Sequence, residues 1–204
     1  MTSAQAAATG ATAGKTGISS QFSESRERHE FEGNVHLGYS IWLSFQGPGA
    51  LKLQETISCL SRQFSAPEFQ PHLTLVGDID LGLEEVRSLA KRFTGGFIPS
   101  EIPIRSVEIS DEYFMALHLS VEIPPDLQSM RETVARSANA RSYKLDAPHV
   151  SLLYGTPGRD ALANAQETVR ADFAGATLRV SGPSIVQSSK TTPISDWKLV
   201  ADFD

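Results

Sequence analysis

From Tyr39 onward, the chain alternates between two spacings of apolar residues. Short runs of apolar or alternating residues are typical of strands, and apolar residues recurring every three or four positions are typical of helices. The pattern predicts strands over 39–45, 72–79, 102–109, 113–123, 149–154, 177–187 and 197–203, and helices over 50–64, 83–93, 125–139 and 160–173.

The order of these elements repeats. Each half of the chain, 38–110 and 111–204, is predicted to run strand, helix, a strand that begins with histidine, helix and strand. Such self-similarity indicates an internal duplication. We therefore expect one α+β domain over 38–204, with two pseudo-symmetric, interleaved lobes. Antiparallel sheets line a central cleft in this arrangement, and the helices lie outside.

Residues 1–37 differ from the rest in composition. They are small and polar, then charged, and offer little to bury, which predicts a disordered leader. The leader lacks the apolar core of a secretory signal and holds only Lys15 as a basic residue in its first 25 positions. No apolar run reaches the roughly 18 residues of a membrane span. We expect a monomer in the cytoplasm, with the nucleus as the alternative.

Charge and cysteine content narrow the function. The formal net charge is −6, which argues against a partner such as long RNA or DNA but is compatible with a small phosphorylated substrate. The single cysteine, Cys59, excludes an intrachain disulfide. Its place in a predicted helix favours a small buried apolar residue.

The duplication is clearest around two histidines. Residues 71–77 read Pro-His-Leu-Thr-Leu-Val-Gly, and residues 148–155 read Pro-His-Val-Ser-Leu-Leu-Tyr-Gly. A bare His-x-Ser/Thr pattern says little, since His118-Leu119-Ser120 also fits it. His118 has no preceding proline and no counterpart in the other half, so we interpret it as an ordinary strand residue.

The spacing within each motif points to chemistry. Residues two positions apart on a strand share a face, so His72 lies beside Thr74, and His149 beside Ser151. Two such strands facing each other would line a cleft with two imidazoles and two hydroxyls. Because imidazole titrates near neutral pH, one histidine can be a base while the other is an acid. Hydroxyls can donate hydrogen bonds to phosphoryl oxygens.

These segments resemble the 2H phosphoesterase superfamily, in which two His-x-(Ser/Thr) motifs face each other across a bilobal cleft. Within it, the chain is most similar to the cyclic phosphodiesterase-like group of plants and yeast. The resemblance covers 38–204. It is carried by Tyr39-Ser40-Ile41-Trp42, Phe69-Gln70-Pro71-His72-Leu73-Thr74, Pro148-His149-Val150-Ser151-Leu152-Leu153-Tyr154, and Lys190-Thr191 followed by Trp197.

The resemblance implies hydrolysis of nucleoside 2′,3′-cyclic phosphates to 2′-phosphates. It also implies opening of ADP-ribose 1″,2″-cyclic phosphate, a by-product of tRNA splicing, and no metal or other cofactor. It favours His149 as base and His72 as acid, although the symmetry of the motifs leaves the reverse assignment open. Thr74 and Ser151 would hold the non-bridging oxygens. Each histidine should have its second nitrogen bonded to a backbone carbonyl.

Three aromatic residues are candidate contacts for a nucleobase. Tyr154 points away from the histidine face of a regular strand and reaches the site only if the strand ends near Gly155. Trp42 could stack on a base, and Phe114 is a weaker candidate. For each, core packing is the alternative. Arg141 and Lys144 precede the second motif and could attract phosphate, with a solvated loop as the alternative.

Other functions remain open. An RNA-end-processing enzyme of the same superfamily, similar to 2′,5′-RNA-ligase-like enzymes or to the exonuclease that trims U6 RNA, would keep the two motifs. A non-catalytic nucleotide-binding protein of the same fold would bind without turnover. A zinc site would need further ligands, and none accompanies the histidines at a useful spacing.

Overall fold

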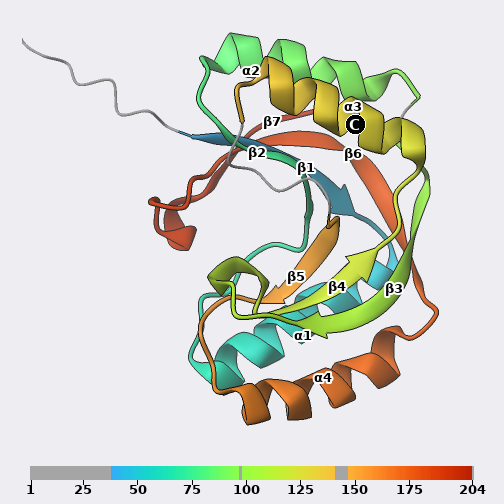
Figure 1. Cartoon of the computed structure of the whole chain (residues 1–204), viewed down its shortest axis with the longest axis vertical. Helices are drawn as coiled ribbons and strands as arrows, with labels where there is room; N and C mark the ends of the chain where they lie inside the picture. Colours follow the sequence, from blue (N-terminus) through green and yellow to red (C-terminus); the bar gives the residue numbers. More distant parts are fainter. Residues whose placement is uncertain (1–37, 97, 141–146, 204) are drawn as a thin grey trace, which may run out of the picture. The chain divides into compact units, whose positions relative to one another are not determined.

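The computed structural model describes residues 38–96, 98–140 and 147–203. Its helices and strands follow the predicted order (Figure 1). They are β1 Tyr39–Phe45, α1 Pro48–Phe64, β2 Leu73–Ile79, α2 Leu83–Ala90, β3 Glu101–Ile109, β4 Leu117–Val121, α3 Pro125–Ser137, β5 His149–Leu153, α4 Arg159–Phe173, β6 Thr177–Gln187 and β7 Lys198–Asp202. Arg141 and Lys144 lie outside the described residues.

The strands form two antiparallel groups. In the first, β1 lies between β2 and β6, and β7 pairs with the other edge of β6. In the second, β4 lies between β3 and β5. The long strand β6 joins them, because its first residues pair with β3 while the residues from Val180 onward pair with β1. The groups also meet where β2 pairs with β5.

The helices cover the outer faces of the two groups. Helices α2 and α3 pack on β1, β2 and β6, whereas α4 packs on β3 and α1 packs on β5 (Figure 1). The predicted α+β class, with antiparallel sheets inside and helices outside, is therefore confirmed. Helices are exchanged between the sequence halves: α1 comes from the first half but covers the second strand group, and α3 does the reverse.

Alternation of side chains places the core. Leu73, Leu75, Val150 and Leu152 are at most 1% exposed and belong to one continuous apolar cluster. These residues flank Thr74 and Ser151 in sequence. Because successive side chains of a strand point to opposite faces, Thr74 and Ser151 point away from the core. No helix among the described residues has the length and apolar character needed to cross a membrane.

Two local predictions were wrong. The predicted strand over 113–123 begins only at Leu117, because Tyr113–Met115 forms a short 3-10 helix. The carbonyls of Tyr113 and Met115 are bonded to the Gly155 N–H and the Ser110 hydroxyl, so they join no strand ladder. Cys59 is exposed rather than buried, because it faces outward from α1 between the buried Ile57 and Leu60.

Candidate active site

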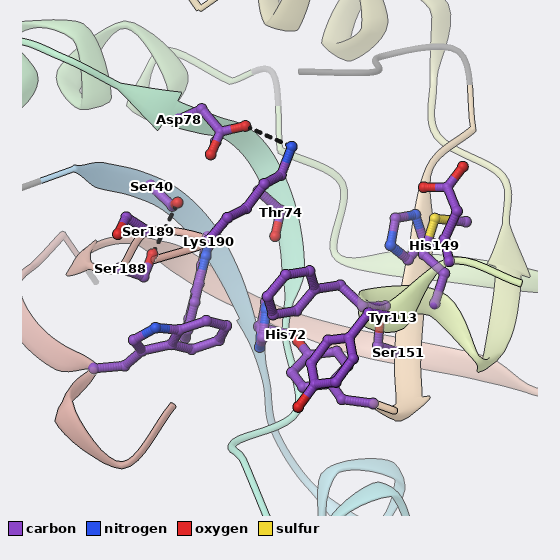
Figure 2. Close-up of a pocket in the computed structure, with 17 residues that line it drawn as sticks. Ser40, His72, Thr74, Asp78, Tyr113, His149, Ser151, Ser188, Ser189 and Lys190 are labelled. Carbon is purple, nitrogen blue, oxygen red and sulfur yellow. Dashed lines mark hydrogen bonds and ion pairs between the residues drawn. The ribbon is translucent and has the colours of Figure 1, made fainter. Parts of the chain in front are cut away.

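The two histidine motifs meet where the strand groups join. Leu73 and Val150, which directly follow His72 and His149, are the residues that pair between β2 and β5. Because a pair across an antiparallel ladder brings its neighbours together, this register places the motifs side by side. Their four polar side chains line one cavity of about 380 Å³, within the size range of small-ligand sites (Figure 2).

His72 is held on two sides. Its ring stacks on the indole of Trp42, with centroids 3.5 Å apart and planes 7° from parallel. Its Nδ1 lies 2.7 Å from the carbonyl oxygen of Gln70, so this nitrogen carries the proton and donates it. Nε2 is then the nitrogen that can gain a proton. Burial of the ring lowers the pKa of His72 to about 4, since a charged imidazolium would lose its hydration there.

His149 has the equivalent arrangement. It opens β5, and its Nδ1 lies 2.9 Å from the carbonyl oxygen of Ala147. In both lobes the accepting carbonyl belongs to the residue two positions before the histidine, which confirms the expected fixing of the second nitrogen. Burial also lowers the pKa of His149 to about 4, and the positive charge of Arg131 acts in the same direction. Both imidazoles are therefore neutral near pH 7.

The two motif hydroxyls differ in their surroundings. Thr74 is partly buried on β2 and lines the cavity. Ser151 is 5% exposed, and its hydroxyl donates to the carbonyl oxygen of Phe114 at 2.7 Å. A serine hydroxyl has a single proton, so Ser151 has to rotate before it can donate to a ligand.

Two of the predicted base contacts, Trp42 and Tyr154, lie at the cavity but are largely covered by other rings. Trp42 is 6% exposed, and the face that lies against His72 is closed to a nucleobase. Tyr154 does reach the cavity, because β5 ends at Leu153 and the chain turns at Gly155, whose φ is 130°. It is nevertheless 2% exposed and stacks on Phe69, with centroids 3.8 Å apart.

Phe114 also lines the cavity, together with an aromatic residue that sequence reasoning did not assign to the site. Trp197 lies with its ring 6.1 Å from that of Phe114, the two planes 25° apart. Its indole N–H donates to the carbonyl oxygen of Thr192. Trp197 belonged to the segments that carry the family resemblance, and that was the one available signal.

The charged residues of the cavity were not predicted either. Among the described residues that line it, Lys190 is the only permanent cation, and Asp78 and Glu112 are the acids. The Lys190 ammonium lies 3.1 Å from the Asp78 carboxylate. These side chains come from a strand end and two loops, where alternation gives no information on direction.

His118, which fits the bare motif, lies close to the site but does not line the cavity. Its position on β4 pairs with Ser151 across the ladder, and its ring centroid is 5.4 Å from that of His149. Its Nδ1 bonds the carbonyl of Met115 at 2.9 Å, and burial lowers its pKa. Among the described residues, no group of three or more histidine, cysteine or acidic side chains is arranged to hold a metal ion.

Comparisons with known proteins agree on one family. The model of the family described as "Cyclic phosphodiesterase-like protein" matches residues 37–204. A cyclic phosphodiesterase of Arabidopsis thaliana is 21% identical over 167 residues, covering 80% of this chain and 92% of the plant protein. A 2′,3′-cyclic-nucleotide 3′-phosphodiesterase of Yarrowia lipolytica is 29% identical, with 82% of this chain and all of the yeast protein covered.

Among solved structures, Usb1 of Kluyveromyces marxianus is 12% identical and superposes with a TM-score of 0.44 over 76% of this chain and 96% of that protein. The family model spans the whole region that contains both motifs, β1 and the segment up to Trp197. The chain therefore belongs to the cyclic phosphodiesterase-like family of 2H phosphoesterases.

Proposed function

We propose that this protein hydrolyses nucleoside 2′,3′-cyclic phosphates to 2′-phosphates, with ADP-ribose 1″,2″-cyclic phosphate as a second substrate of the same type. One observation carries the proposal: two histidines line one cavity, His72 buried and His149 partly buried, and each has Nδ1 bonded to the carbonyl two residues before it. Each ring thus presents Nε2 as its titrating nitrogen. The names of the Arabidopsis and Yarrowia relatives support the same activity.

The reaction needs one histidine as a general base and the other as a general acid. His149 Nε2 takes a proton from water as the water oxygen attacks phosphorus. The bond between phosphorus and the ribose 3′ oxygen breaks, and His72 Nε2 donates a proton to that oxygen. The free cavity holds both imidazoles neutral, and the anionic substrate raises the pKa of an imidazole beside it. Binding of the anionic substrate thereby favours uptake of a proton from solvent by His72, the acid that cleavage requires.

In this proposal, Thr74 and Ser151 stabilise the phosphoryl oxygens. Charge on these oxygens grows in the transition state, and a hydroxyl donor aimed at them lowers the barrier. Ser151 would exchange its bond to the Phe114 carbonyl for one to the substrate. Phe114 and Trp197 offer ring faces for the base, whereas Trp42 acts by holding His72.

The test is turnover of adenosine 2′,3′-cyclic phosphate and ADP-ribose 1″,2″-cyclic phosphate, with the product isomer identified. We expect His72→Ala and His149→Ala each to lower kcat by at least about 10²- to 10⁴-fold, the usual contribution of acid–base catalysis. His118→Gln is the matched control, because His118 does not line the cavity. It should retain most of the activity, and all three variants should keep the wild-type circular dichroism spectrum.

Four outcomes would count against the proposal. Wild-type turnover in either alanine variant would remove the two-histidine mechanism. Loss of activity in a chelator would indicate a metal enzyme. Turnover of an oligonucleotide with a cyclic end, but not of the mononucleotide, would favour the RNA-end-processing alternative. Tight binding without turnover would indicate a nucleotide-binding protein.

A further inference from the structure

The cavity has little positive charge for a site that takes a phosphate. Both histidines are neutral near pH 7, and Asp78 and Glu112 are acidic. Lys190 is the only permanent cation among the described residues of its wall. The mechanism above makes no use of this cation, so its place in the cavity needs a separate explanation.

The loop that carries Lys190 is firmly attached to β1. The backbone N–H of Ser188 donates to the carbonyl of Gly38, and the Ser188 hydroxyl donates to that of Ser40, each at 2.9 Å. Ser189 Oγ accepts the N–H of Thr192 at 3.1 Å. Gly38 permits this contact, since a side-chain carbon there would lie 3.0 Å from Cβ of Ser189. The loop is therefore a fixed wall from which Lys190 extends.

Asp78 holds the end of that side chain in place. The lysine side chain is 61% exposed and the aspartate 22% exposed, and their charged atoms are 3.1 Å apart. An ammonium has three N–H groups, and this contact occupies one of them. An ion pair so open to water contributes little stability, so Lys190 can share its charge with an arriving anion at small cost.

The pair lies away from the reacting centre. Figure 2 shows Thr74 between the Asp78–Lys190 pair and Ser151, and the Ser188 and Ser189 hydroxyls on the same side as Lys190. Asp78 follows Thr74 by four residues and lies next to the last residue of β2, Ile79. A cyclic phosphate bound between Thr74 and Ser151 would thus leave Lys190 beside another part of the substrate.

We propose that Lys190, aimed by Asp78 and flanked by Ser188 and Ser189, binds a second phosphoryl group, the one attached to the 5′ oxygen of the substrate's ribose. This inference rests on the proposed function. In a nucleotide whose 2′ and 3′ oxygens carry the cyclic phosphate, the 5′ oxygen carries the next anionic group. The preferred substrate is then a 5′-phosphorylated nucleotide rather than a nucleoside cyclic phosphate.

Binding of two product-like probes tests the subsite without turnover. Isothermal titration calorimetry would compare adenosine 2′-phosphate with adenosine 2′,5′-bisphosphate. We expect the wild-type protein to bind the bisphosphate about tenfold more tightly, the usual effect of one charge-assisted hydrogen bond. Lys190→Gln should bind both probes equally, with the affinity for adenosine 2′-phosphate unchanged. Lys198→Gln, which removes an exposed lysine on β7, is the matched control and should keep the tenfold preference.

The same binding experiment distinguishes a ligand role for Lys190 from a purely structural ion pair with Asp78. If Lys190 only tied its loop to β2, Asp78→Asn and Lys190→Gln would behave alike. If Lys190 is the ligand, Asp78→Asn keeps the cation and most of the preference. Equal binding of both probes by the wild-type protein, or the same loss of affinity for both probes in Lys190→Gln, would overturn the inference.

Kinetics then separate this inference from the proposed function. Adenosine 2′,3′-cyclic phosphate, its 5′-phosphorylated form and a dinucleotide with a 2′,3′-cyclic end would be compared by kcat/KM. No hydrolysis of any of them would reject the proposed function, whereas hydrolysis with equal kcat/KM would reject only the subsite. A preference for the 5′-phosphorylated mononucleotide identifies a monoester ligand, and a preference for the dinucleotide identifies an RNA phosphodiester.

Discussion

At the scale of single residues, two histidines with matching backbone bonds have different neighbours. His72 is covered by the face of Trp42, whereas the ring of His149 lies nearly perpendicular to that of His118. His72 is 7% exposed, and loss of hydration is the largest cause of its lowered pKa. We therefore expect the indole of Trp42 to lower the pKa of His72 as well as to orient its ring.

Removing the indole should reverse that effect. In Trp42→Leu, water reaches one face of His72, so the charged form regains hydration and the pKa rises from about 4 toward the ordinary 6.5. Titration of the labelled histidine ring by NMR measures this directly. Trp197→Leu is the control, because the Trp197 ring contacts Trp42 but is not stacked on His72. An unchanged pKa in Trp42→Leu would show that other residues exclude the water.

Single residues also show which features a sequence can reveal. The four motif residues were predictable because a repeated pattern and the two-residue period of strands specify which side chains share a face. The contact of Trp42 with His72 depends on the pairing of β1 with β2, which residue spacing does not encode. Cys59 was misjudged because a helix has an outer face as well as an inner one.

At the scale of elements, the end of β5 determines what enters the cavity. A regular strand would turn Tyr154 away from His149, but β5 ends one residue earlier. Gly155 then adopts a φ of 130° and donates its N–H to the carbonyl of Tyr113 at 2.8 Å. This bond fastens the 3-10 helix that carries Phe114 to the end of the motif strand.

Glycine is required at that turn. A φ of 130° is strained for any residue with a Cβ, so Gly155→Ala should cost about 1–3 kcal/mol of unfolding free energy. For a chain of this size, each kcal/mol lowers Tm by about 2–4 °C. Gly158→Ala is the matched control, because no atom lies within 4 Å of a Cβ there and its φ is −62°. Equal Tm values for the two variants would contradict this account.

The elements themselves were predicted well where periodicity was long, and poorly where local bonding prevailed. Helix α1 and strand β6 have clear periods, and their predicted ranges lie within two residues of the observed ones. Residues 113–115 are an apolar run like that of a strand, but bonds from Gly155 and Ser110 occupy two of their carbonyls. Gly155 is distant in sequence and Ser110 lies outside the strands, so the spacing of apolar residues could not predict these bonds.

At the scale of the whole described domain, the internal repeat predicted two lobes but not the exchange of helices between them. Helix α1 lies in the first half of the chain and packs on β5 of the second. Helix α3 lies in the second half and packs on β2 of the first. The apolar cluster runs through both halves without a break. Each half therefore relies on a helix of the other half to cover part of its strands.

Fragments of the chain test this interdependence. If the two halves, 38–110 and 111–204, are expressed separately, each lacks a helix that covers one of its strands. The uncovered apolar face then leaves too little buried area to offset the loss of chain entropy. We expect each fragment alone to show no cooperative thermal unfolding by circular dichroism. Mixed or co-expressed, the two should assemble and recover the intact domain's transition. A cooperative transition in either isolated half would show that the lobes fold independently and that the exchanged helices add little stability.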